Sequence, residues 1–302
     1  MTEAGIVERV AETRRVEPSM AVERPPFPTK LKIEVTGRCD LRCSFCTLTY
    51  KPRSAKGDIE PALAFRVIRE ARDLGVRDLG LFWLGEPLLN ARLTEYVAYA
   101  KAIGTPYVFI TTNGRLASTT RLRDLYDAGI DSIKFSVNAV DAQEYRRVTA
   151  VDAFDRVISN VRGAWELRGA RAQPKLYAST VVLDEPDGER RFEAAHRLIG
   201  AYVDQHYALR QYGIQAAAKH RAAVLLAMLP CWSLFTEPHI SYTGWMSACF
   251  YDHDPKYYLG DLTVSTLIAA WHSERAAALR RAHLAKDVAG TPCADCLAYA
   301  HA

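Results

Sequence analysis

Three cysteines within eight positions constrain this chain more than any other feature of its sequence. Cys39, Cys43 and Cys46 follow a short apolar segment in the order C-x-x-x-C-x-x-C. Three thiolates in one loop suit three irons of a cubane iron–sulfur cluster and leave its fourth iron open. A structural zinc ion would normally require a fourth protein ligand nearby, and none is obvious. The spacing therefore predicts a redox-active [4Fe-4S] cluster with one open iron.

From residue 31 onward, short apolar runs suited to strands alternate with longer segments of helical period. This alternation is typical of a parallel sheet flanked by helices, and six repeats predict an α/β fold with a partial (β/α)6 TIM-like barrel. The chemistry of such barrels lies at the C-terminal ends of the strands. The expected strands are 31–35, 78–84, 107–112, 132–137, 176–182 and 206–211. The expected helices are 61–74, 93–103, 119–128, 152–168 and 190–203.

The chain is expected to have four parts. Residues 1–28 are charged and end in a cluster of prolines, so we expect an N-terminal extension that lies outside the fold. The barrel is expected over 29–213, followed by an Ala-rich connecting helix over 214–230. A small iron–sulfur domain over 231–302 should contain a hairpin around Gly244 and a helix over 267–284.

Composition restricts the partners and the location of the protein. The net charge is +4, with 25% charged residues in which basic and acidic side chains are interspersed, a pattern that disfavours nucleic-acid binding. No apolar run approaches the roughly 18 residues of a membrane span, and the N-terminus is too charged for a signal peptide. We therefore expect a cytoplasmic protein. Its seven cysteines, an odd number, favour metal binding or catalysis over disulfides.

The first cysteine motif, with an aromatic residue before its last cysteine, resembles the signature of the radical S-adenosylmethionine (SAM) family. In that family the open iron binds SAM, and the reduced cluster splits it into methionine and a 5′-deoxyadenosyl radical. The segment 84–87 resembles the family's G-G-E-P motif, with Leu84 in place of the first glycine. The resemblance implies SAM contacts from Phe45, Gly85, Glu86, Pro87, Thr112, Asn113, Ser136, Asn138, Arg146 and Arg147.

Two of these groups have a second interpretation. Asn113 and Gly114 are also typical of a tight turn, and Arg146 and Arg147 are also typical of the solvated face of a helix. We place them at the SAM site because they follow strand ends or, for the arginines, because guanidinium groups bind carboxylates with two hydrogen bonds.

Cys231, Cys249, Cys293 and Cys296 form a second group. Four thiols can hold another cubane cluster or a zinc ion, and a C-x-x-C pair alone does not choose the metal. With Gly244 shortly before Cys249, the spacing resembles the annex of the SPASM/twitch radical SAM enzymes. The shorter twitch form carries one auxiliary [4Fe-4S] cluster. The resemblance therefore implies two clusters, with SAM consumed as a cosubstrate.

The segment 244–252 resembles the aminoglycoside-tailoring radical SAM enzymes. This resemblance implies an epimerase of antibiotic biosynthesis that inverts a sugar carbon, with Cys249 as the catalytic hydrogen donor. The auxiliary cluster then keeps the other three cysteines and requires a further ligand, such as Asp252 or His253, or has an open iron. Alternatively, Cys249 is the fourth ligand, and the enzyme is a dehydrogenase that oxidises a secondary alcohol of an aminocyclitol.

The implied partners are a polycationic aminoglycoside and an electron donor such as flavodoxin or ferredoxin. Ammonium groups require carboxylates in the pocket, and the candidates are Glu34, Asp252, Asp254 and Asp261. Peptide modification is disfavoured because we expect it to require a leader-recognition domain larger than residues 1–28. A zinc-binding interaction module is the remaining alternative from outside enzymology.

Overall fold

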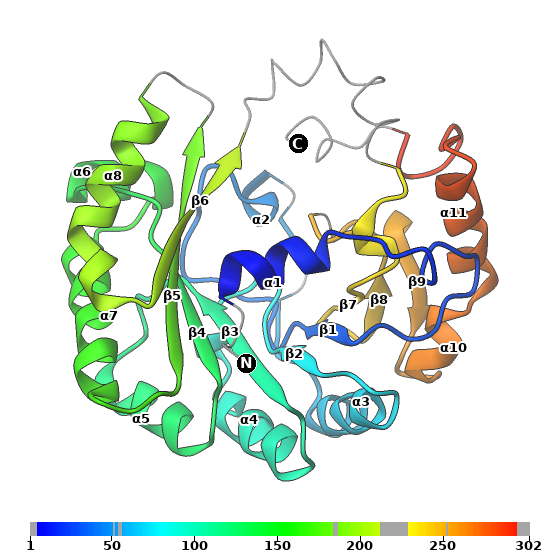
Figure 1. The fold of residues 1–302 in the computed structure, drawn as a ribbon, viewed down its shortest axis with the longest axis horizontal. Coiled ribbons are helices and arrows are strands. Elements are labelled where there is room, and N and C mark those ends of the chain that lie inside the picture. Colours follow the sequence, from blue (N-terminus) through cyan, green and yellow to red (C-terminus); the bar gives the residue numbers. More distant parts are fainter. Residues whose placement is uncertain are drawn as a thin grey trace.

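The computed structural model describes residues 5–50, 52–53, 56–183, 187–211, 229–251 and 253–294. Within these residues the strands form one nine-stranded sheet in the order β6-β5-β4-β3-β2-β1-β7-β8-β9 (Figure 1). The barrel strands are parallel and lie side by side in sequence order, as β1 (Lys30–Ile33), β2 (Asp78–Gly80), β3 (Tyr107–Thr112), β4 (Ser132–Ser136), β5 (Lys175–Leu183) and β6 (Gln205–Gln211). The expected partial barrel is confirmed.

The helices that follow the barrel strands lie along the outer side of the sheet (Figure 1). The helices of this region are α2 (Thr47–Tyr50), α3 (Pro61–Asp73), α4 (Leu93–Ala102), α5 (Thr119–Asp127), α6 (Ala142–Thr149), α7 (Phe154–Arg168) and α8 (Gly188–Ile199). Helix α3 shows why the expected helices form: Glu60 caps its first turn by accepting from Leu63 N, and Pro61 occupies its first position. No helix of the described residues is long and apolar enough to cross a membrane.

Alternation along the barrel strands separates the core from the cavity. In β4, Ile133 and Phe135 are fully buried, whereas Lys134 and Ser136 between and after them line a cavity. Successive side chains of a strand point to opposite faces, so the apolar set packs under the helices while the polar set faces inward. The sheet therefore presents a polar inner face.

The C-terminal strands extend the barrel sheet. Strand β7 (His239–Ile240) pairs in parallel with β1, and β8 (Trp245–Ser247) and β9 (Tyr258–Asp261) continue the sheet as antiparallel strands. The hairpin expected around Gly244 is confirmed, and this glycine has a φ of +90° that suits the turn.

The single helix expected over 267–284 is wrong. It is divided into α10 (Leu267–Trp271) and α11 (Glu274–Leu284), because the Ser273 side chain accepts from Ala276 N and starts a new helix. These two helices cover the β7–β9 end of the sheet (Figure 1). The connecting helix expected over 214–230 falls almost entirely outside the described residues.

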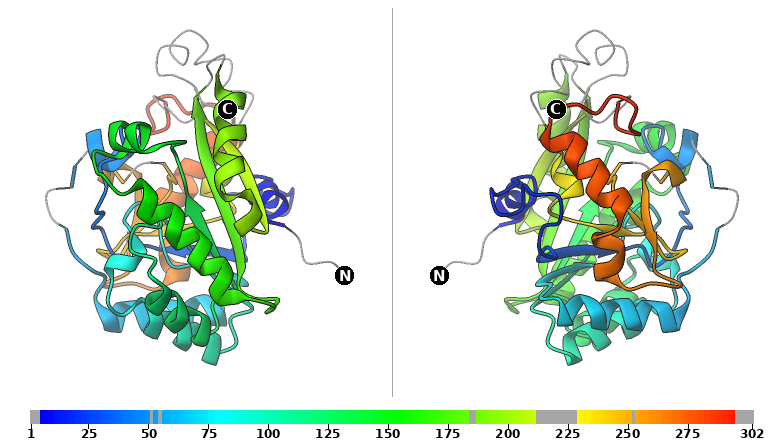
Figure 2. Two further views of the ribbon diagram at one scale, coloured as in Figure 1. Left: turned by 90° about the vertical axis from the view of Figure 1, so that its left-hand side faces the viewer. Right: turned by 90° about the vertical axis from the view of Figure 1, so that its right-hand side faces the viewer.

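The expectation that residues 1–28 lie outside the fold is wrong for the part that is described. Helix α1 (Ile6–Thr13) lies against the strands on one side of the molecule (Figure 2). Its Arg9 forms an ion pair with Asp78 of β2, with the two atoms 3.2 Å apart. Ile6 and Val10, four residues apart, both face the cavity. The many charged residues of the segment kept this pair of apolar residues from being recognised in the sequence.

Candidate functional site

A cavity of about 1370 Å³ lies on the inner side of the sheet. This volume exceeds the roughly 300–1,000 Å³ of a typical single-ligand pocket, so there is room for a cofactor and a substrate together. Both predicted cysteine groups line it, through Cys39, Cys43, Cys46, Cys231, Cys249 and Cys293. Cys296 lies outside the described residues.

The first cysteine motif forms a loop between β1 and α2. The Cys46 N–H donates to the Cys43 carbonyl at 3.0 Å, which closes the end of the loop. The Arg42 N–H donates to the Thr149 carbonyl at 2.9 Å, so the C-terminal end of α6 supports the loop from the side. Helix α6 was not among the helices expected from the sequence, and its position explains how the loop is held open toward the cavity.

The thiols of this loop are protonated when no metal is bound, and iron would have to displace these protons. Burial raises the pKa of Cys39 and of Cys43 to about 12, and it also raises the pKa of Cys46. Iron replaces the proton of a thiol when it binds. Within the described residues no group of three His, Cys, Asp or Glu side chains is already arranged around a metal position. The donor set itself, three thiols of one loop that face one cavity, fits a cluster with an open iron.

Glu86 joins the ends of β2 and β3. Its carboxylate accepts from Thr112 Oγ1 and from Asn113 N, both at 2.7 Å. Its own N–H donates to the Arg38 carbonyl at 2.8 Å, which connects these strand ends to the cluster loop. Burial raises the pKa of Glu86 to about 7 against the opposing effect of its hydrogen bonds. These hydrogen bonds hold the carboxylate in place, and through them Glu86 aligns Thr112 and Asn113, two of the predicted SAM contacts.

Asp40 makes a second connection between the cluster loop and β3. Its carboxylate accepts from Asn113 Nδ2 and forms an ion pair with Arg115, each at 2.7 Å. Gly114 follows with a φ of +80°. The sequence left two interpretations of Asn113 open, a tight turn and a position in the cavity. Both are present in the structure.

Gly85 lies against the cluster loop so closely that a side chain cannot fit. A Cβ atom at this position would lie 2.0 Å from the Thr36 carbonyl oxygen and 2.8 Å from that of Arg38. We expect Gly85→Ala to displace the cluster loop and to lower SAM cleavage by about 10²-fold or more, since displacements of about 1 Å at an active site have effects of this size. Iron content and 5′-deoxyadenosine formation measure the effect.

Gly57→Ala is the matched control for this prediction. A Cβ atom at Gly57 would meet its nearest neighbour, a ring carbon of Tyr242, at an ordinary 3.8 Å. We expect this variant to retain its iron and its SAM cleavage. Wild-type iron content and cleavage in Gly85→Ala would show that the close approach is unimportant.

Most of the predicted SAM contacts line the cavity, namely Phe45, Gly85, Glu86, Thr112, Asn113, Ser136 and Asn138. The prediction is wrong for Arg146 and Arg147. Helix α6 directs them away from the cavity, where they pair with Asp152 and Glu144 and leave 63% and 69% of their side chains exposed. Pro87 also lies outside the cavity lining, because it is buried at the first position of a short 3-10 helix.

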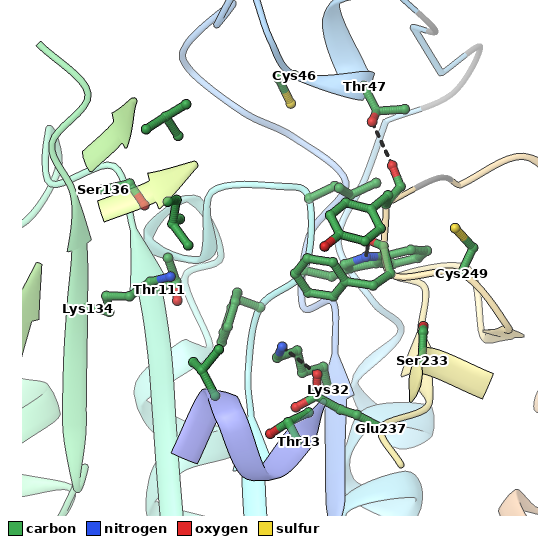
Figure 3. A pocket seen from close by; sticks show the side chains of 18 of the residues that line it. Thr13, Lys32, Cys46, Thr47, Thr111, Lys134, Ser136, Ser233, Glu237 and Cys249 are labelled. Carbon is green, nitrogen blue, oxygen red and sulfur yellow. Dashed lines mark hydrogen bonds and ion pairs between the residues drawn. The ribbon is translucent and has the colours of Figure 1, made fainter. Parts of the chain in front are cut away.

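The loop that carries Cys249 is fixed by side chains from the barrel. Trp83, just after β2, donates its indole N–H to the Phe250 carbonyl at 2.7 Å. Thr47, directly after the first cysteine motif, donates its hydroxyl to the Tyr251 carbonyl at 2.7 Å. Figure 3 shows Cys249 and Cys46 on the walls of the same cavity, with the Thr47 contact between their loops. No motif in the sequence indicated these connections.

A buried ion pair lies at the floor of the cavity (Figure 3). Lys32 Nζ lies 2.7 Å from Glu237 Oε2 and 4.5 Å from the centre of the Phe250 ring. Burial would raise the pKa of Glu237, but the Lys32 charge and the His239 hydrogen bond together lower it to about 2. The pair joins β1 to the segment before β7, directly beneath the Cys249 loop.

Among the described residues, the carboxylates suggested for substrate binding do not line the cavity. Glu34 accepts from the Leu84 and Gly85 backbone and is paired with Arg53 at 2.9 Å. Asp254 and Asp261 cap their own turns by accepting from backbone N–H groups two residues on. Asp252 lies outside the described residues, and His253 is not part of the cavity lining. The carboxylates that do line the cavity are Asp78, Glu86 and Glu237.

Two family profiles match the chain. The radical SAM superfamily matches residues 33–192, and an iron–sulfur cluster-binding domain, SPASM, matches residues 231–297. Curated relatives match over about half of the chain. A probable GTP 3',8-cyclase of Methanothermobacter marburgensis is 35% identical over 134 residues, or 44% of this chain and 43% of that protein. One of Thermococcus kodakarensis is 32% identical over 53% of this chain and 50% of that protein. The chain thus spans about half or less of their length.

Solved structures match over most of the chain. BtrN, in complex with AdoMet and 2-DOIA, superposes with a TM-score of 0.57 at 18% identity, over 85% of this chain and 87% of that one. SuiB of Streptococcus suis, bound to S-adenosylmethionine, superposes with a TM-score of 0.66 at 17% identity, over 84% of this chain and 68% of that one. At these identities the likeness shows the fold alone.

Proposed function

Since the chain belongs to the radical SAM superfamily, we propose that it is an epimerase of aminoglycoside biosynthesis that converts neomycin C to neomycin B. It uses a [4Fe-4S] cluster with SAM, and it has an auxiliary cluster. Cys39, Cys43 and Cys46 are the proposed ligands of the first cluster. When held by these cysteines, that cluster would supply the electron that cleaves SAM to the 5′-deoxyadenosyl radical, which would remove a hydrogen atom from the sugar carbon.

The proposed reaction depends on Cys249. Its thiol gives a hydrogen atom to the opposite face of the carbon radical, so one S–H bond breaks and one C–H bond forms with inverted configuration. The S–H bond is the weaker of the two, which makes the transfer favourable. The resulting thiyl radical takes up one electron and one proton before the next turnover, and flavodoxin or ferredoxin in the cytoplasm is the proposed source of electrons. SAM is therefore consumed in each turnover.

The single observation that best supports this role is that Cys249 lines the same cavity as the cluster loop, on a loop held by Trp83 and Thr47. A hydrogen donor must stand at a fixed distance across the substrate from the abstracting radical, and these contacts join its loop to the segments that follow β2 and the first cysteine motif. The cavity is large enough for SAM and a sugar substrate together.

The test is an anaerobic incubation with reductant, SAM and neomycin C, with GTP and an aminocyclitol as parallel substrates. We expect a product of unchanged mass from neomycin C, with one 5′-deoxyadenosine formed for each molecule of product. Conversion of GTP, or no deoxyadenosine in response to neomycin C, would overturn it. GTP belongs in the panel because curated relatives that match about half of this chain are probable GTP 3',8-cyclases.

An aminocyclitol dehydrogenase is the second candidate. The auxiliary-cluster profile spans residues 231–297 and so includes Cys249 as a possible fourth ligand. The structural likeness to BtrN, solved with 2-DOIA, supports a substrate of the aminocyclitol class. Product mass separates the two reactions, because oxidation of an alcohol removes two hydrogen atoms and epimerisation removes none.

Trp83→Phe should uncouple hydrogen abstraction from hydrogen return. The variant keeps an aromatic ring but loses the donor to the Phe250 carbonyl, so the Cys249 loop is held less well. We expect the ratio of epimer to 5′-deoxyadenosine to fall roughly 5-fold, the equivalent of about 1 kcal/mol for one neutral hydrogen bond. Both products are quantified in one chromatogram.

Trp165→Phe, on the outer helix α7, is the control for a tryptophan change that leaves the cavity intact. It should retain the wild-type ratio. An equal fall of both products in Trp83→Phe would indicate a general loss of folded enzyme and would contradict the positioning role.

A further inference from the structure

His283 lies on α11 beside the second cysteine group, and neither the first cluster nor the proposed hydrogen transfer uses it. Its side chain is 1% exposed, and it lines the cavity together with Cys231 and Cys293. These two cysteines also pack against the same small apolar cluster of Leu229 and Val288. The imidazole therefore lies at the wall where the auxiliary cluster must be held.

The hydrogen bond of His283 fixes which ring nitrogen carries the proton. The Cys231 backbone N–H donates to His283 Nδ1 at 3.2 Å, so Nδ1 uses its lone pair as an acceptor. A neutral imidazole with an acceptor at Nδ1 has its proton at Nε2. Nε2 is buried and has no hydrogen-bond partner among the described residues.

A buried N–H group without an acceptor is rare in folded proteins, because its lost hydration is not replaced. Cysteine thiolates and bridging sulfides are hydrogen-bond acceptors, and iron–sulfur proteins commonly surround them with N–H donors. The tautomer assigned from this hydrogen bond disfavours direct binding to iron, since the nitrogen lone pair that a ligand would use is already occupied at Nδ1 and absent at Nε2.

We infer that His283 is part of the auxiliary-cluster site, where its Nε2–H donates a hydrogen bond to a cluster thiolate or sulfide sulfur. Such a bond offsets negative charge on the cluster and raises its reduction potential. The inference concerns the auxiliary cluster alone, so it holds whether Cys249 donates hydrogen or binds iron. It also identifies a residue of this site that the cysteine pattern did not indicate.

The first test is spectroscopic. Holoenzyme in which histidine is labelled with ¹⁵N is reduced, and pulsed electron paramagnetic resonance is recorded on the auxiliary signal, identified as the signal that added SAM leaves unchanged. A weak nitrogen coupling that disappears in His283→Gln protein is the expected result. A strong coupling typical of a ligand, or no coupling at all, would overturn the inference.

The second test measures the midpoint potential of the auxiliary cluster in the same holoenzyme by redox titration. His283→Leu removes the donor, so its potential should fall below that of the wild type with unchanged iron content. His283→Gln retains an N–H donor of similar reach, so its midpoint potential should stay nearer that of the wild type. His196→Leu, on the outer helix α8, is the control and should have the wild-type potential. An unchanged potential in His283→Leu, or loss of the auxiliary iron, would contradict the hydrogen-bond role.

Discussion

Cys249→Ala should form 5′-deoxyadenosine in response to neomycin C while forming at least about 10³-fold less neomycin B, the scale seen when a reacting group is removed. The variant still abstracts hydrogen because the first cluster loop and its contacts to Glu86 and Asp40 are untouched. It has no S–H bond at the opposite face of the carbon radical. Chromatography of both products on one anaerobic reaction provides the measurement.

Two matched variants define what this result means. Cys249→Ser keeps the size and polarity of the side chain, but its O–H bond is too strong to give a hydrogen atom to a carbon radical, so it should behave like alanine. Cys46→Ala should lose both products because the first cluster is lost. If Cys249→Ala still made neomycin B, or if it lost its auxiliary iron, Cys249 would not be the donor.

Lys32→Met should destabilise the protein by about 3–5 kcal/mol, because it leaves the Glu237 carboxylate buried without its partner. Only 5% of the Glu237 side chain is exposed, so water replaces the lost contact poorly. Denaturant unfolding of the two proteins measures the difference. The double variant Lys32→Met, Glu237→Gln removes both charges and should recover much of the loss. A loss below about 1 kcal/mol in the single variant would mean that the pair is not buried in solution.

The same pair predicts the effect of acid. The pKa of Glu237 is lowered from 4.5 to about 2 in the folded protein. Below pH 4.5 the unfolded chain therefore binds a proton that the folded protein does not, so this contribution to stability is complete above pH 4.5 and is lost as pH falls toward 2. Glu237→Gln should lack this part of the acid dependence, and an unchanged acid limb would contradict the assignment.

The barrel could be predicted because its strands follow a simple rule. Runs such as 107–112 and 132–137 are short, rich in apolar residues and separated by helical segments, and β3 and β4 match them closely. Helix α1 was missed because it lies in a charged segment that ends in a cluster of prolines, and α6 because it is short and highly polar. In both cases tertiary contacts, not local preference, complete the helix.

The site was predictable only where a motif fixes the backbone. The cluster loop, Gly85 and Asn113 follow strand ends, and the sheet brings strand ends together. The prediction for Arg146 failed because its position around helix α6 decides whether it faces the cavity. So polar a segment contains few apolar residues that would indicate this position in the sequence. The positions of Lys32 and Lys134 in the cavity could have been predicted from the sequence. A lysine that alternates with apolar residues in a barrel strand must face inward. His283 had no such signal, because its contact to Cys231 spans 52 residues of sequence.

The most direct test of the account is one wild-type turnover of neomycin C in deuterium oxide with SAM and reductant. A thiol exchanges its proton with solvent, so hydrogen returned by Cys249 arrives as deuterium. We predict neomycin B with a single deuterium at the inverted carbon and one unlabelled 5′-deoxyadenosine for each product. An inverted product without deuterium, or a product two hydrogens lighter than neomycin C, would contradict the account.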